Sequence, residues 1–273
     1  MSERQPVALG ERSWVEVARL AEEGDLAILP VGAVEQHGPH LPLLVDASQV
    51  EAIAREASAR TGIPVAPTVA YSSSQGHSRL FPGTMALTPE TTARVLAELC
   101  DWLYSAGFRK ILLLKGHVGN EGPVWNALDA AQFRLPRNAC LRGVSWWHLT
   151  PEVWQLVTSD LPEAAGLFHA NWGETSLMLH LRPDLVHMER AVDFDETDWA
   201  FTYDMAKISP FGAIGRRTTH ATAADGERIF ETAVGALVDT LERLRVEEPP
   251  QQWPEDVGRW RREAAARYLG EGD

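Results

Sequence analysis

The stretch "LPVGAVEQHGPHLPLLVDASQV", residues 29–50, joins an apolar run to a helical pattern through a loop that gathers carboxylates and imidazoles. The apolar run belongs to "DLAILPVG" (25–32), and its length and composition are typical of a buried strand. The helical pattern "DASQVEAIAREASARTG" (46–62) opens with an aspartate that can cap a helix and ends at a glycine. A buried strand followed by an amphipathic helix is the repeating unit of a parallel α/β sheet.

The same alternation continues along the chain and predicts an α/β fold with a mostly parallel central sheet. The predicted strands are 25–32, 64–72, 110–117 and 139–147. The predicted helices are 46–62, 88–108 with Thr88 as N-cap and Pro89 in the first turn, 119–134, 173–181, 225–246 and 255–268. The proline-rich "EEPPQQWP" (247–254) suggests one domain over residues 1–250 and a C-terminal helical appendage over 251–273.

Composition limits the classes of partner. Lys and Arg number 25 against 38 Asp and Glu, and a net charge of −13 repels nucleic acid and anionic membranes. No apolar run approaches the roughly 20 residues needed to span a bilayer. The N-terminal "MSERQPVALGERS" lacks the apolar core of a signal peptide, and Cys100 and Cys140 have the apolar contexts of reduced, buried thiols. We therefore expect a cytoplasmic protein that acts on a small molecule.

The loop after the first strand has the residue types of a metal site. Glu35 and His37 are two residues apart, so in extended backbone their side chains lie on the same side. Asp46 follows after a turn that contains two prolines. Two carboxylates and an imidazole suit Zn²⁺, Mn²⁺ or Fe²⁺. The alternative is that both acids are solvated loop charges and that Asp46 only caps the next helix.

The third strand leads into a second polar loop, in "KILLLKGHVGN" (110–120). His117 closely follows the apolar run, and Gly116 and Gly119 beside it let the backbone approach a ligand closely. Asn120 could orient a ligand or cap the following helix. A buried core histidine is the alternative for His117. A phosphate-binding loop is disfavoured, because no lysine follows the second glycine as that signature requires.

A further cluster lies in "LFHANWGETSLMLHLRPDL" (167–185). Here Glu174 could add an oxygen ligand and His169 could move protons. The alternative for Glu174 is a carboxylate favoured in the first turn of a helix by the helix dipole. No G-x-S-x-G elbow is present and neither cysteine has a neighbouring histidine, so a covalent nucleophile has little support.

Taken together, these stretches resemble the creatininase family of metal-dependent amidohydrolases. The matching segments are "LPVGAVEQHGPHLPLLVDA", "FPGTMALTPET", "GHVGN", "HANWGETSLML" and "GAIGRRTTHATAADGERIF", which together span residues 25 to about 232. The resemblance implies a three-layer α/β/α fold and two divalent metal ions, Zn²⁺ first and Mn²⁺ or Fe²⁺ as alternatives. It also implies a homohexamer built as a trimer of dimers.

The resemblance also implies roles for individual residues. The implied metal ligands are Glu35, His37, Asp46 in the bridging position, His117 and Glu174, and the implied catalytic residues are His169 and Glu174. His77, Asn120 and Trp172 are expected to contact the substrate.

The sequence also departs from the family pattern. Enzymes that open creatinine have Tyr-Glu where this chain has Val118 and Gly119, so creatinine is not the expected substrate. Arg216 and Arg217 replace a familiar Asp-Pro pair, and they could meet an anionic substrate or form salt bridges.

The predicted function is therefore a metal-dependent hydrolase that cleaves a C–N bond of a small amide, lactam or formamide. Cleavage of a cyclic ketone C–C bond, cleavage of a peptide bond, and a non-catalytic metal-binding module are the alternatives. Ten tryptophans, several in "VSWWHL", "PEVWQL" and "ANWGE", suggest aromatic pocket walls, with core packing or a subunit interface as the alternative.

Overall fold

The computed structural model of the chain describes residues 4–77, 80–159, 168–195, 204–248 and 257–269. At its centre lies a three-stranded parallel sheet in the order β1-β2-β3, formed by Leu26–Val31, Lys110–Lys115 and Cys140–Ser145. In this register Leu29 lies opposite Leu113, which lies opposite Gly143 on its other side. The predicted parallel α/β arrangement is confirmed.

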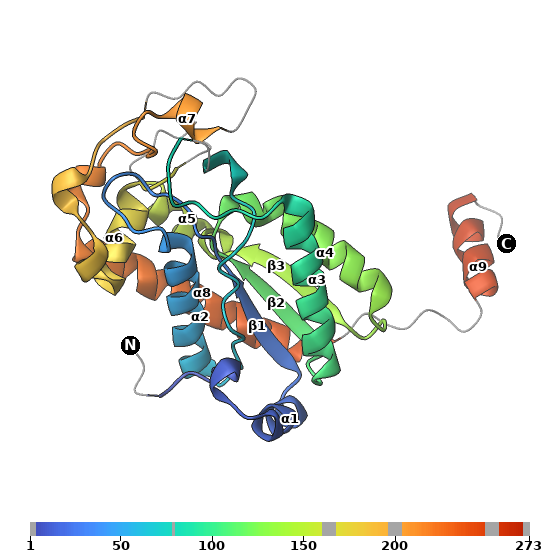
Figure 1. The fold of residues 1–273 in the computed structure, drawn as a ribbon. Helices are drawn as coiled ribbons and strands as arrows, with labels where there is room; N and C mark the ends of the chain where they lie inside the picture. The colour runs from blue at the N-terminus through green and yellow to red at the C-terminus, as the bar shows by residue number, and fades with distance from the viewer. Residues whose placement is uncertain (1–3, 78–79, 160–167, 196–203, 249–256, 270–273) are drawn as a thin grey trace.

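Helices cover both faces of this sheet and give three layers (Figure 1). The described α-helices are α1 (Trp14–Glu23), α2 (Val45–Thr61), α3 (Pro89–Ser105), α4 (Glu121–Arg134), α5 (Pro151–Val157), α6 (Trp172–Leu181), α7 (Met205–Ile208), α8 (Ala223–Val246) and α9 (Val257–Leu269). Helices α2 and α8 lie on one face of the sheet, and α3 and α4 lie on the other.

Alternate strand residues supply the two apolar interfaces. Ile28 and Leu112 pack with α2 and α8, whereas Leu29 and Leu113 pack with α3 and α4. Successive side chains of a strand point to opposite faces, so a sheet that is covered twice needs apolar residues at every position. This requirement explains the unbroken apolar run that precedes His117.

The predicted strand over residues 64–72 is wrong in part, because only isolated bridges form there. Val65 and Val69 pair with β1 in parallel orientation, and their neighbours do not continue the ladder. Backbone hydrogen bonds join this segment to Ile28 and, further along, join Val69 to Pro30 and Gly32. Pro30 of β1 lies between the two bridges and has no backbone N–H to donate, which interrupts the ladder there.

Several predicted helix ends are confirmed. The Thr88 hydroxyl accepts a hydrogen bond from the Thr91 backbone N–H at 3.2 Å, with Pro89 in the first turn of α3. Gly62 ends α2 in the left-handed conformation, with φ of 74°.

Helix α9 falls within the predicted appendage, and Figure 1 shows it apart from the layered body. None of the helices in the described ranges is long and apolar enough to cross a membrane.

Candidate active site

The carboxyl ends of β1 and β2 place two loops and the first turn of α2 side by side. Parallel strands end at the same edge of a sheet, which is where ligands bind in open α/β folds. Gly116 follows β2, and a Cβ atom there would lie 2.6 Å from the backbone oxygen of Asp46. Only glycine permits this approach, which brings Asp46 next to His117.

The imidazole of His117 lies between two carboxylates. Its Nε2 is 3.1 Å from Glu35 Oε2, and its Nδ1 is 3.2 Å from Asp46 Oδ2. On the other side of Asp46, His37 Nε2 lies 3.3 Å from Oδ1. The Nδ1–H of His37 donates to the backbone oxygen of Glu35 at 3.0 Å, which leaves Nε2 as the free ligand nitrogen.

A short strained turn brings Glu174 to the same place. Ala170 has φ of 51°, in the left-handed region that non-glycine residues rarely adopt, and its N–H donates to Glu174 Oε2 at 2.6 Å. The Asn171 side chain accepts from the Glu174 backbone N–H at 3.0 Å and so caps α6. Such strain persists only where surrounding contacts impose it, and it often marks a functional site.

Metal-ligating atoms converge in three overlapping sets of buried residues. Within each set, the ligand atoms lie within 4.8 Å of one another. The sets are Glu35, Asp46 and His117; His37, Asp46 and Glu174; and Glu35, His37 and His169. Asp46 belongs to the first two, so one carboxylate joins them.

The pKa values of the residues in this cluster are shifted because the groups are buried and lie in contact with one another. Burial raises the pKa of Glu35 and of Glu174 to about 7. Although burial opposes it, the pKa of His37 is raised to about 10 by Asp46, and the pKa of His117 is raised to about 9 by Glu35 and Asp46. The two imidazoles outweigh the burial of Asp46 and lower its pKa.

Buried atoms without a hydrogen bond test whether a cation fits this cluster. Glu35 Oε1, His37 Nε2 and Asp46 Oδ2 are buried and form no hydrogen bond with any residue of the described ranges. Buried polar atoms are costly unless they are satisfied, so several of them in one cluster need an explanation. Carboxylate oxygens and an imidazole nitrogen are a donor set that divalent metal ions accept. The residues present therefore fit such an ion.

His169 lies at the edge of the cluster. Its Nε2 is 2.7 Å from the backbone oxygen of Gln36 and 3.1 Å from the Gln36 side-chain nitrogen. A carbonyl only accepts, so the tautomer that satisfies the shorter contact carries its hydrogen on Nε2. Its Nδ1 then faces Glu35 Oε1 at 3.4 Å. Burial, with help from His77, lowers the pKa of His169 well below its usual value. No sequence signal identified Gln36 as the partner of this histidine.

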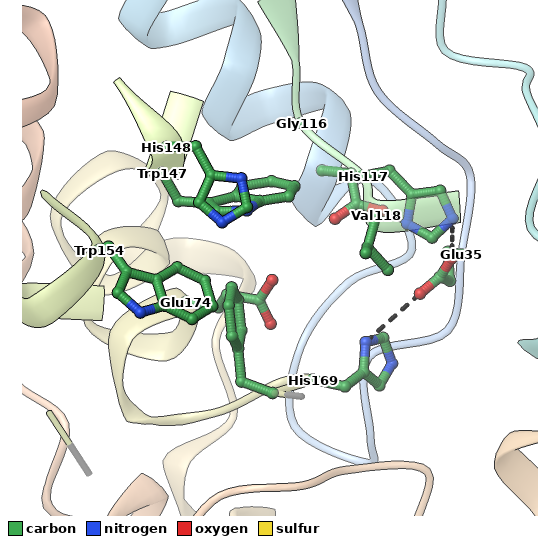
Figure 2. A pocket seen from close by; sticks show the side chains of 11 residues that line it. Glu35, Gly116, His117, Val118, Trp147, His148, Trp154, His169 and Glu174 are labelled. Carbon is green, nitrogen blue, oxygen red and sulfur yellow. Dashed lines mark ion pairs between the residues drawn. The ribbon is translucent and has the colours of Figure 1, made fainter. Parts of the chain in front are cut away.

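A pocket with about 520 Å³ of empty space, part of it open to solvent, leads to this cluster. Figure 2 shows Glu174, His117, Glu35 and His169 around the inner end of the pocket. Side chains with aromatic or imidazole rings surround the remainder of the pocket. The ring-bearing residues of the wall are Trp147, His148, Trp154 and Phe168. The sequence suggested the two tryptophans, but His148 and Phe168 were missed. His148 follows β3 closely, so the strand-end rule that located the other loops could have found it.

The three residues expected to contact the substrate lie behind the pocket. Trp172 is buried in the main apolar core, and Arg217 lies over its ring at 5.4 Å. Asn120 donates from its side chain to the backbone oxygen of Gly32 at 2.9 Å. His77 Nδ1 lies 3.1 Å from Glu35 Oε1. None of the three is among the described residues that line this pocket.

Arg216, the other arginine of the pair, has an acidic partner at the surface. Arg216 forms an ion pair with Asp195. Of the two roles considered for the arginine pair, the structure therefore favours the salt bridge for Arg216.

Comparisons with known proteins agree with this geometry. A family model described as creatininase, creatinine amidohydrolase, matches residues 10–241. Creatinine amidohydrolase of Pseudomonas putida is 31% identical over 260 residues, which covers 89% of this chain and 98% of the relative. Mycofactocin precursor peptide peptidase of Mycolicibacterium smegmatis is 34% identical over 232 residues, which covers 80% of this chain and 85% of the relative.

Solved creatininase structures share the fold. One described as creatininase Mn has a TM-score of 0.80 and 29% identity and covers 89% of this chain and 100% of its own. A variant of the Zn-Zn type has a TM-score of 0.79 and 30% identity and covers 89% of this chain and 99% of its own.

Proposed function

Because the chain belongs to the creatininase family of metal-dependent amidohydrolases, we propose that it hydrolyses a C–N bond in a small amide, lactam or formamide. One observation carries the proposal most: Asp46 is shared by two buried sets of ligand atoms, and Glu35, His37 and Asp46 each keep a buried atom that forms no hydrogen bond with the described residues. A carboxylate in this position suits a pair of cations that act together.

We assign the first metal position to Glu35, Asp46 and His117 and the second to His37, Asp46 and Glu174. Divalent ions held there would supply Lewis-acid chemistry, which activates water and polarises an amide carbonyl near neutral pH. The zinc and manganese forms of solved relatives support these two metals, with Fe²⁺ as a further candidate.

The chain's own residues would then handle the proton and the substrate. His169 is neutral and presents its Nδ1 lone pair toward the cluster, so this atom can take up a proton and pass it to the departing nitrogen. The ring-bearing wall offers apolar surface for the substrate to pack against. The products are a carboxylate and an amine, and the water supplies both the oxygen and the balancing proton.

Creatinine itself is not the proposed substrate. A Cβ atom at position 119 would lie 2.4 Å from His117 Nε2 and 2.6 Å from the backbone oxygen of Ser73. This loop therefore has no room for the glutamate expected at that position in enzymes that open creatinine, and Glu174 takes over as the carboxylate ligand. Assembly as a hexamer and a cytoplasmic location stay predictions.

Metal analysis of one variant pair tests the proposal. We expect Asp46→Asn to lose both metal equivalents and Glu174→Gln to lose one, because only Asp46 belongs to both sets. Elemental analysis after dialysis measures the metal content, and circular dichroism checks that each variant is folded. Folded Asp46→Asn protein that keeps two equivalents would refute the shared position.

The wild-type protein loaded with Zn²⁺, Mn²⁺ or Fe²⁺ is then offered amides, lactams, formamides, short peptides and creatinine, and released amine is measured. Turnover of one of the first three classes is the expected result. Turnover of peptides alone would move the assignment to a peptidase, and no turnover with metal bound would favour a binding module.

A further inference from the structure

Helix α9 is an addition to the family fold. The family match ends at residue 241, and α9 occupies Val257–Leu269. Figure 1 shows this helix well away from α3, α4 and the rest of the layered body. A role for α9 must therefore come from features of this chain.

A helix of this size gains stability from packing against a partner surface. It has 13 residues, and isolated helices shorter than about 12–15 residues are marginal in water. Its Trp260 side chain is 46% exposed. An exposed tryptophan on a short helix is typical of a segment that becomes stable when it docks.

The charge of α9 is opposite to that of the rest of the chain. Its sequence, "VGRWRREAAARYL", has four arginines and one glutamate, whereas the whole chain has a net charge of −13. Arg259 pairs with Glu263 at 2.7 Å within the helix. Arg261, Arg262 and Arg267 form no ion pair with any residue in the described ranges. A basic helix is attracted to an acidic protein, and the chain itself is such a protein.

The outer side of α3 and α4 offers a matching surface. We call Trp102, Trp125 and Phe133 the aromatic face; they are 73%, 67% and 85% exposed. The Asp101–Arg134 ion pair, at 2.8 Å, joins the two helices at positions adjacent to Trp102 and Phe133 in the chain. Several large exposed aromatic side chains together mark an interaction surface.

Acidic side chains flank this aromatic face. Glu98 is one helical turn before Trp102 on α3, and Asp129 is one turn after Trp125 on α4, so each acid lies on the same side of its helix as the tryptophan. Both acids are exposed and form no ion pair with the described residues. A guanidinium group can stack on a tryptophan ring and pair with a carboxylate beside it.

We propose that α9 of one copy docks on the aromatic face of a second copy, with its arginines against Trp102 and Trp125 and their neighbouring acids. A second copy fits better than the same chain, because α9 extends away from its own α3 and α4 (Figure 1). Reciprocal exchange around a two-fold axis forms the same contact twice and closes the assembly. This contact is independent of the proposed hydrolase activity.

Photo-crosslinking of the full chain tests this contact. Trp260 is replaced by the photoreactive amino acid p-benzoylphenylalanine, the protein is irradiated, and the products are separated on a denaturing gel and mapped by mass spectrometry. We expect a band at twice the chain mass, with crosslinked peptides from α3 or α4. The double substitution Trp125→Ser, Phe133→Ser should reduce that band at least tenfold.

The matched control is Trp14→Ser on α1, where Trp14 is 81% exposed. It should leave the band unchanged. Because all three substituted side chains are exposed, each variant should fold, and thermal melts check this. Crosslinks confined to a single chain mass, crosslinks to other helices, a band insensitive to the double substitution, or no crosslink at all would each overturn the proposal.

Discussion

The floor and the wall of the pocket are built in different ways. At the floor, Glu35, Asp46 and His117 are buried and make ion pairs at 3.1 and 3.2 Å. At the wall, the His148 ring is exposed and contacts neighbouring aromatic rings, such as Trp154 at a centroid distance of 4.9 Å. Charged groups that many contacts hold in place suit a reaction that the members of a family share. Aromatic rings at the open mouth of a pocket can differ from one member to another. We therefore propose that the floor sets the reaction and that the wall selects the substrate.

The strongest test of this division is His169→Gln at the floor. Loss of a proton-transfer group typically lowers turnover by about 10²–10⁴-fold, and we expect this fall in kcat with unchanged metal content. Kinetics on the best substrate of the panel, together with elemental analysis, measure both quantities. His220→Gln, at an exposed histidine, is the control and should match the wild type. A kcat that changes less than threefold would remove His169 from the reaction.

A smaller effect is expected from Gly119→Ala, which adds one methyl group behind His117. Its Cβ would lie 2.4 Å from His117 Nε2 and 2.6 Å from the backbone oxygen of Ser73, so His117 or the loop must shift. Substitutions that disturb the orientation of metal ligands typically cost 10–100-fold in metal affinity, and we expect a loss of about that size. Competition with a chelator measures the affinity.

Gly122→Ala is the matched control, because a Cβ atom there meets nothing within 4 Å. It should keep the metal affinity and raise the free energy of unfolding by about 0.5–1 kcal/mol, since alanine is the better helix former. Equal metal affinities for the two variants would show that the floor is more adaptable than its contacts indicate.

The smallest effect is expected at the wall, from His148→Ala. Aromatic contacts contribute about 0.5–1.5 kcal/mol each, so KM should rise by up to about tenfold while kcat changes little. Steady-state kinetics separate the two, and metal content should stay at the wild-type level. His187→Ala, another partly exposed histidine, should change neither. A large fall in kcat for His148→Ala would mean that the wall takes part in the chemistry.

The sequence predicted the floor much better than the wall. Glu35, His37 and Asp46 lie close together in the chain, and the rule that parallel strands end at one edge adds His117. Tertiary packing decides which side chains face the pocket, and no local sequence pattern predicts that packing. Trp172 and Asn120 accordingly lie in the core and against β1, whereas His148 and Phe168 line the pocket.

Prediction of the fold from the sequence has the same limit. Strands β1 and β2 were predictable because burial on both faces demands unbroken apolar runs. Residues 64–72 have similar composition, but Pro30 of β1 cannot donate a ladder hydrogen bond to them and only bridges remain. The tautomer of His169 depends on the backbone oxygen of Gln36, and a backbone contact between distant segments leaves no trace in residue types.

The crowding at Gly119 has an evolutionary consequence. A lineage that holds its last carboxylate on α6 cannot relocate it to the β2 loop by one substitution, because the newcomer would collide with His117 before it could replace Glu174. The loop carrying Ser73 must retreat first.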